Sequence, residues 1–331
     1  MVIASASPEG AQRTLVGLDA ARGIELWRRP VEAGQWPQPV LGGGLGVLLP
    51  RSGGSRDAAE GSSGQDAVVF ELATGTLVRA VELGAPAAPE DRKAAWIEEG
   101  RLVLPRFGRS RENQDALTAF DLEGGARAWR VPVDGTRTLD SIVRCKGQCY
   151  LVYLVSGPGS ADGGLVELDT RLGATRPVPG VKLGPEDLPI GLKSSAVTEL
   201  DEPFLFVRRA APGGKETLVR AIHLPYGQRW AYRLPIPGGA LYPGSFPLPA
   251  VTSRLVLLVY TDDPEVQGGR GQPSTQMVAL DRESGSHREL RLLVDMGRSE
   301  SIELATLENL LIVCGKGLVL ALSGPTGEEQ R

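Results

Sequence analysis

A set of regularly spaced carboxylates is the first feature of this chain that could do chemistry. Four aspartates each stand four residues before a glycine: Asp19, Asp121, Asp169 and Asp281, before Gly23, Gly125, Gly173 and Gly285. Gathered at one place, such acids could bind a hard cation or transfer protons. A short polar side chain that opens a tight turn also accepts backbone hydrogen bonds, and glycine tolerates the positive φ near the end of the turn. We interpret these as turn residues and expect no metal site.

The cysteines and histidines offer little further chemistry. Cys145 and Cys149 bracket a short polar segment that reads as a hairpin turn, so they could face one another across it. A disulfide and two free thiols both fit this spacing. The chain has only two histidines, His223 and His287, and both lie beside expected turns, so a Cys/His zinc site lacks ligands. We therefore expect no cofactor held by these residues.

Arginine and aromatic side chains form the candidate binding face. Its members fall in or near expected loops: Trp36, Arg106, Arg109, Arg111, Arg209 and Tyr242. The arginines could form a basic rim for an acidic partner, and the aromatic rings could stack on a peptide or a carbohydrate. The alternative is that the arginines are solvated and the rings separate neighbouring blades, since Arg outnumbers Lys 30 to 6.

Known catalytic motifs are missing. The glycine-rich Gly42–Gly46 leads into an expected strand, so it is not a phosphate loop that opens a helix. The chain contains neither Gly-x-Ser-x-Gly nor His-Glu-x-x-His. These observations favour a protein without catalytic activity, and the enzyme alternative stays open.

The glycine turns divide the chain into repeats of 42–58 residues, because Gly75, Gly227 and Gly327 end turns of the same spacing. A fixed period of about this size is typical of solenoids and propellers. The short apolar-rich segments beside each turn predict hairpins rather than helices. With the turn placed between the third and fourth strands, each repeat has four strands. In the fifth repeat we expect Ala196–Leu200, Phe204–Arg208, Leu218–Leu224 and Gln228–Ile236.

The sequence therefore predicts an all-β fold: a β-propeller of four-stranded antiparallel blades. We expect about seven blades, with six or eight as alternatives, in one domain over residues 1–331. The first blade lacks a strand at the N-terminus, so the chain could also be a fragment of a longer protein.

The repeat resembles that of the pyrroloquinoline-quinone-like (PQQ-like) propellers, the quinoprotein alcohol dehydrogenase-like family. Its pattern of aliphatic–Asp–x–x–x–Gly–x–x–x–Trp is matched best by Leu18–Trp27 and Phe120–Trp129. The resemblance implies that Trp27 and Trp129 dock between neighbouring blades. The equivalent positions elsewhere hold other residues, among them Ala231, although Trp230 is one residue away. The enzymes of this family hold their quinone with adjacent cysteines, which this chain lacks, so we expect no bound quinone.

Charge and hydropathy limit the partners. A net charge of −4 and a pI near 5.5 give no basic field for nucleic acid. No apolar run is long enough for a spanning helix, and Met1–Ser7 does not resemble a signal peptide, which leaves the compartment undetermined.

The expected loops between second and third strands are long and share one face with the connections between blades, and loops on a rigid scaffold often bind partners. We expect a non-catalytic module that binds or scaffolds another protein, or another domain of the same polypeptide, through this long-loop face. The alternative is an enzyme that uses the channel mouth, either a quinone-dependent dehydrogenase or a polysaccharide-active hydrolase or lyase.

Overall fold

Short apolar segments between glycine turns form the strands of this protein. The computed structural model describes residues 2–6, 13–31, 38–50, 66–83, 88–107, 115–132, 137–155, 163–184, 186–210, 216–234, 249–262, 274–292, 302–307, 310–315 and 318–323. These residues form β-strands and one short helix, α1 (Pro89–Lys93). Inner strands are buried along most of their length, as in Leu45–Leu48, whereas the outer strand Arg127–Pro132 alternates between exposed and buried residues. Strands buried on both faces indicate sheets that are covered on both sides.

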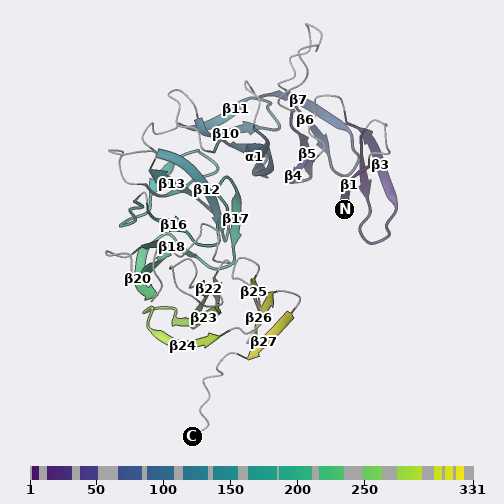
Figure 1. The fold of residues 1–331 in the computed structure, drawn as a ribbon. Helices are drawn as coiled ribbons and strands as arrows, with labels where there is room; N and C mark the ends of the chain where they lie inside the picture. The colour runs from purple at the N-terminus through teal and green to yellow at the C-terminus, as the bar shows by residue number, and fades with distance from the viewer. Residues whose placement is uncertain are drawn as a thin grey trace. The chain divides into compact units, whose positions relative to one another are not determined.

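The chain divides into two compact units, and the first comprises Met1–Ile142, Leu168–Arg176 and Ser195–Val197. It holds three antiparallel sheets in which strands pair in sequence order (Figure 1). The first sheet has three strands: β1 (Val2–Ala6), β2 (Thr14–Leu18) and β3 (Glu25–Pro30). The second has four: β4 (Val40–Gly42), β5 (Leu45–Leu48), β6 (Asp66–Glu71) and β7 (Leu77–Glu82). The third also has four: β8 (Trp96–Glu98), β9 (Arg101–Pro105), β10 (Asp115–Asp121) and β11 (Arg127–Pro132).

The second unit comprises Val143–Glu167, Pro177–Ser194 and Thr198–Arg331, and it also contains three whole sheets. The fifth sheet of the chain has the strands β16 (Leu188–Pro189), β18 (Phe204–Ala210), β19 (Thr217–His223) and β20 (Gly227–Leu234). The sixth has β21 (Ala250–Val251), β22 (Leu255–Asp262), β23 (Ser274–Asp281) and β24 (His287–Leu292). The last has three described strands: β25 (Glu303–Leu307), β26 (Leu310–Gly315) and β27 (Leu318–Ser323).

The fourth sheet, whose residues are divided between the units, corrects one predicted strand. Its order is β15 (Thr175–Pro177), β14 (Gly164–Leu168), β13 (Gln148–Val155), β12 (Arg137–Cys145) and β17 (Val197–Leu200). The assignment of Ala196–Leu200 to the fifth sheet was therefore wrong, because Ile142 N donates to Ala196 O (3.0 Å) and draws this segment to β12. The two-residue β16 takes its place, with Pro189 opposite Val207. An edge strand can contain proline, but one this short carries no periodic pattern.

Neighbouring sheets pack face to face within each unit. In the first unit, Val47 and Val69 of the second sheet share a core with Leu102 and Phe120 of the third. In the second unit, Phe206 of the fifth sheet packs with residues of the sixth in the same way. Four-stranded antiparallel sheets stacked in this manner are the blades of a β-propeller, which confirms the predicted fold class.

Four of the periodic turns are closed by the aspartate that opens them. Asp19 Oδ1 accepts the amides of Ala21 (2.9 Å) and Arg22 (3.3 Å), and Gly23 N donates to Asp19 O (2.7 Å). Equivalent side-chain bonds are made by Asp121, Asp169 and Asp281. Every described glycine at the turn end has a positive φ: Gly23, Gly75, Gly125, Gly173, Gly227 and Gly285. One carboxylate oxygen of each aspartate therefore bonds the backbone of its turn, and Asp281 Oδ2 in addition accepts from Arg288 Nη2 (2.7 Å).

The tryptophan that follows every other turn docks on the next turn, and we call this contact a latch. The indole Nε1 atoms of Trp27, Trp129 and Trp230 donate to the carbonyls of Leu72 (2.7 Å), Thr170 (3.0 Å) and Arg282 (2.8 Å). Each ring lies over the glycine that ends the accepting turn: Gly75, Gly173 and Gly285. A Cβ at these glycines would come within 2.5–2.7 Å of the ring. The first, third and fifth turns therefore supply a tryptophan, and the second, fourth and sixth receive one.

The fifth turn makes its latch with Trp230 and not with Ala231, the residue at the aligned position. In the fifth turn, His223 pairs with Gly227, four residues later. In the first turn, Asp19 N bonds to Ile24 O, five residues later. The fifth turn is thus one residue shorter. Both turns are followed by a bulge, so the shortening moves the docking tryptophan one place toward the glycine.

Cys145 and Cys149 of the β12–β13 hairpin are not joined by a disulfide, which confirms the alternative of two thiols, and both are buried. Only Lys146 and Gly147 connect the strands, and both have positive φ, as a two-residue hairpin turn requires. Cys145 therefore lies opposite Gln148 and shares its core with Tyr150. Since successive residues point to opposite faces, Cys149 points away from that core. The expectation that the two cysteines could face one another was wrong.

Candidate functional site

The described part of the chain includes only two members of the predicted binding face. Trp36, Arg109, Arg111 and Tyr242 lie outside the described residues. Arg106 is half-buried at the end of β9, in the first unit, where its amide donates to Ala116 O (2.8 Å). Arg209 is an exposed residue of β18, in the second unit.

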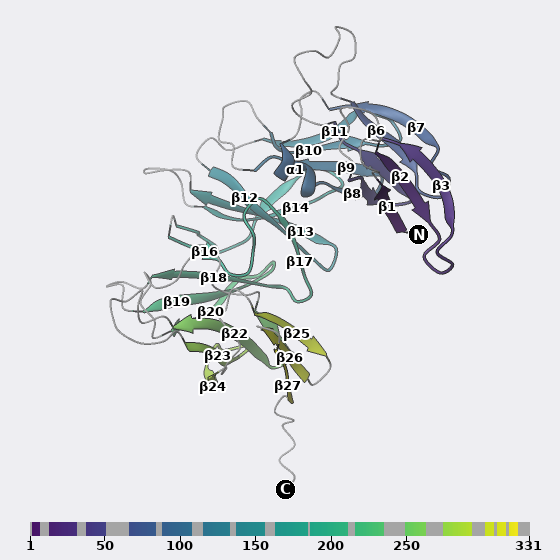
Figure 2. The same cartoon turned by 45° about the vertical axis from the view of Figure 1, so that its right-hand side comes forward.

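In the first unit, Asp91 and Arg92 bond to the backbone beside two predicted long loops, one after Pro50 and one after Phe107. Helix α1 lies beside β9 (Figure 2), and its Asp91 accepts the amides of Ala88 (3.2 Å) and Phe107 (3.1 Å). Arg92 Nη1 donates to Pro50 O (2.7 Å). Both side chains are buried, so they hold the loop stems in place and do not present chemistry to solvent.

The same sequence, Pro-Glu-Asp, ends at Asp187 in the second unit. Asp187 Oδ2 accepts the amide of Gly184 (2.7 Å) and pairs with Arg220 Nη2 (2.7 Å), and both side chains are buried. A buried charge needs such a partner because removing it from water is costly. This pair therefore also fixes a connection between strands.

The fifth turn departs from the chemistry of the others. His223 occupies the position that an acidic residue holds in the other described turns, and Tyr226 lies three residues later. Tyr226 is 71% exposed, a large value for an aromatic side chain, and stacks on His223 with ring centroids 5.1 Å apart. The guanidinium of the exposed Arg229 lies over the outer ring, 6.0 Å from its centroid. Exceptions to a repeated local rule tend to occur at functional sites.

The histidine of this turn is held in its neutral form. Its ring packs edge-on against Phe204 with centroids 5.0 Å apart. The pKa of His223 is lowered, first by burial and then by the positive charges of Arg229 and Arg282. Glu283 acts in the opposite direction and is a weaker influence. At neutral pH the ring is therefore an uncharged stacking surface beneath Tyr226.

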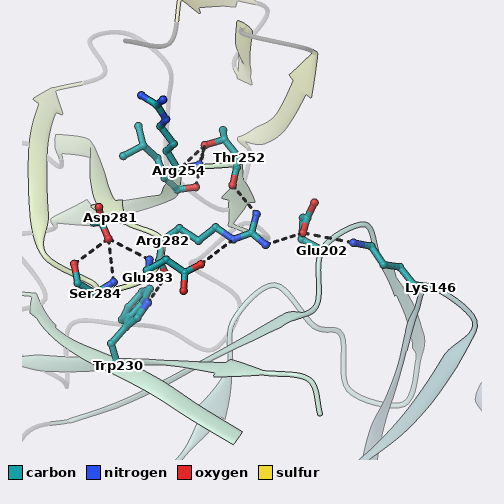
Figure 3. A network of polar contacts seen from close by, with 10 residues as sticks. Lys146, Glu202, Trp230, Thr252, Arg254, Asp281, Arg282, Glu283 and Ser284 are labelled. Carbon is teal, nitrogen blue, oxygen red and sulfur yellow. Dashed lines mark hydrogen bonds and ion pairs between the residues drawn. The ribbon is translucent and has the colours of Figure 1, made fainter. Parts of the chain in front are cut away.

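Arg282 ties the fifth turn to its surroundings (Figure 3). Its guanidinium lies over Phe204 at 5.0 Å, donates to Thr252 O (3.0 Å) and bonds to Glu202 Oε2 (3.1 Å). Lys146 Nζ reaches the same carboxylate oxygen from the other side, at 3.8 Å. The backbone carbonyl of Arg282 accepts the Trp230 indole. A partly buried network of hydrogen bonds and ion pairs therefore lies beside the exposed Tyr226 and Arg229. We name His223, Tyr226 and Arg229 the fifth-turn surface.

The sequence drew attention to His223 and Gly227 only as turn residues, and it did not identify Tyr226, Arg229 or Arg282. The replacement of the turn acid by histidine, with a tyrosine inside the turn, is the signal that could have found them. The contacts themselves join residues far apart in sequence. Arg282 and Glu202, for example, are 80 positions apart, and no local pattern pairs them.

The described residues contain neither a cluster of metal ligands nor a helix that could span a membrane. No group of three or more His, Cys, Asp or Glu side chains within them could hold a metal ion. None of the helices in the described part is long and apolar enough to cross a membrane.

The comparisons with known proteins are distant. No family model matches the chain, and no curated protein matches it in sequence. Apo AztD from Citrobacter koseri is similar in structure, with 14% identity, 94% of this chain and 89% of that chain covered, and a TM-score of 0.45. The complex of KlAtg21 with the coiled-coil of AgAtg16 gives 10% identity, coverage of 88% and 81%, and a TM-score of 0.40. KlHsv2 with loop 6CD replaced by a Gly-Ser linker is 11% identical, with 84% of this chain and 78% of that chain covered and a TM-score of 0.40. Similarity at this level leaves the assignment of function to the chain's own residues.

Proposed function

We propose that this protein is a non-catalytic β-propeller that binds another protein, or another domain of the same polypeptide. The observation that supports this proposal is the fifth-turn surface, in which an exposed tyrosine and an exposed arginine lie side by side. Tyrosine and arginine are enriched among the residues that dominate protein–protein binding.

We also propose that the repeats are of the PQQ-like type. The docking of Trp27 and Trp129 on the following turn supports this, since that is the role the resemblance implies for them. The long-loop face with Arg106 and Arg209 remains a second predicted surface.

Site-specific photo-crosslinking tests the binding function. The photoreactive amino acid p-benzoylphenylalanine is placed at position 226 of the full chain and, as a matched control, at 172. Leu172 has the same place in its turn and is 73% exposed. We expect one recurring crosslinked protein from position 226 in the source cells, and binding of that purified protein to the chain by calorimetry. Crosslinks that are equally diverse at both positions would contradict the proposal.

A further inference from the structure

Arg229 is the charged residue of the fifth-turn surface, and no carboxylate of the described residues pairs with it. Arg282 is the other arginine that lowers the pKa of His223. It forms an ion pair with Glu202, and the same carboxylate also pairs with Lys146. Arg229 is exposed and makes no ion pair with any described residue. Its positive charge is therefore available to a partner.

The position of Arg229 over a ring defines what it can bind. The guanidinium carbon lies 6.0 Å from the centroid of the Tyr226 ring, and the side chain is exposed, so its N–H groups can reach a partner. The N–H edge of a guanidinium matches the two oxygens of a carboxylate, which it can bind with two parallel hydrogen bonds. The exposed Tyr226 ring supplies apolar area beside it.

We propose that the fifth-turn surface binds an acidic segment of a partner polypeptide, with an Asp or Glu carboxylate on Arg229 and an adjacent apolar side chain on Tyr226. This inference rests on the proposed binding function and adds the chemistry of the partner. A polypeptide fits better than a nucleic acid, because the net charge of −4 repels an extended polyanion.

A random peptide library displayed on phage, selected on the immobilised full chain, tests the proposal. We expect the enriched peptides to carry Asp or Glu beside an apolar residue. The best peptide, labelled with fluorescein, is then titrated by anisotropy with the wild-type chain. Tyr226→Ala and Arg229→Gln should each weaken binding tenfold or more, and Leu172→Ala, the exposed equivalent in another turn, should change it less than twofold.

Charge reversal separates a direct contact from a change in fold. Arg229→Glu should lose the acidic peptide and bind the same peptide with lysine at the acidic position. Enriched peptides without acids, or with affinity unchanged in Tyr226→Ala and Arg229→Gln, would overturn this proposal while leaving the binding function intact. A 12-nucleotide single strand that binds as tightly as the peptide would overturn it as well. A library that yields no binder contradicts the proposed function itself.

Discussion

Two turn glycines of the same backbone conformation, Gly23 and Gly285, have different surroundings and therefore different structural roles. Gly23 and Gly285 both end a turn with φ near +68°, at +69° and +67°. A Cβ at Gly23 would meet nothing within 4 Å, whereas at Gly285 it would meet the ring of Trp230 at 2.5 Å. The first glycine is required by conformation alone, and the second also by the approach of the tryptophan.

Alanine substitution at the two glycines separates these requirements. Both Gly23→Ala and Gly285→Ala incur the cost of the left-handed conformation, about 1–2 kcal/mol. Gly285→Ala should lower the free energy of unfolding by about 1–3 kcal/mol more, because the added methyl overpacks the latch. Urea unfolding of the two variants measures the difference, and equal losses would contradict the role assigned to Trp230.

The neutral state of His223 predicts a pH dependence of stability. Its pKa in the folded chain lies below the ordinary value of 6.5, so the unfolded chain binds the proton more readily. The stabilisation is complete above pH 6.5 and is lost as the pH falls through the folded pKa. The free energy of unfolding should therefore fall on acidification below pH 6.5, by at most about 1.4 kcal/mol per pH unit from this one group.

His223→Gln provides the control for this pH effect. Denaturant unfolding at several pH values between 7.5 and 5.5 should give a shallower curve for the variant than for the wild-type chain. Parallel curves would show that another group is responsible for the dependence.

At the scale of single elements, the β12–β13 hairpin decides the chemistry of its cysteines. The two-residue turn places Cys145 and Cys149 on opposite faces of the sheet. Burial also raises the pKa of the Cys145 thiol, which disfavours the reactive thiolate. We therefore expect mild oxidation of the folded chain to leave both as thiols, as judged by alkylation and mass spectrometry. A Cys145–Cys149 disulfide formed under native conditions would show that the hairpin register is different.

Elements were predictable where local rules decide them. The aliphatic–acid–glycine corners located the turns, because turn conformation depends on neighbouring residues. The first strand of the fifth sheet was missed, since two residues ending in Pro189 show no alternation and β17 looked like the better strand. The sequence showed Trp230 one residue from the aligned Ala231, but it did not predict that Trp230 docks, because the shift depends on the length of one turn. Histidine in the place of the turn acid could have pointed to the fifth-turn surface. Its surroundings could not be predicted, since three-dimensional packing alone joins Phe204, His223 and Arg282.

At the scale of the molecule, the latches couple sheets in pairs. Trp27 joins the first turn to the second, whereas the second meets the third through Arg79, whose side chain lies beside Gly125. Removal of the Trp27 latch should therefore destabilise the second turn, which receives the indole, and leave the third turn unchanged. In Trp27→Ala, we expect faster amide hydrogen exchange at residues 71–76 and unchanged exchange at 121–125.

The neighbouring Leu26→Ala is the matched control for the exchange experiment, because Leu26 is 49% exposed and takes no part in the latch. It should leave both segments as they are in the wild-type chain. Faster exchange spread evenly over all turns of the Trp27→Ala variant would mean that the latches do not act in pairs.

The alternation of latching turns also bears on how this chain arose. The glycines of the three tryptophan-bearing turns, Gly23, Gly125 and Gly227, are each 102 residues apart. The glycines of the receiving turns, Gly75, Gly173 and Gly285, are instead 98 and 112 residues apart. Tandem duplication of an ancestral gene segment encoding two blades, one giving an indole and one receiving it, would leave the first spacing, with later changes in loop length altering the second. Descendants that gain or lose whole copies of that segment would then change by two blades at a time, so relatives with one blade more or fewer should show a broken alternation at a single place.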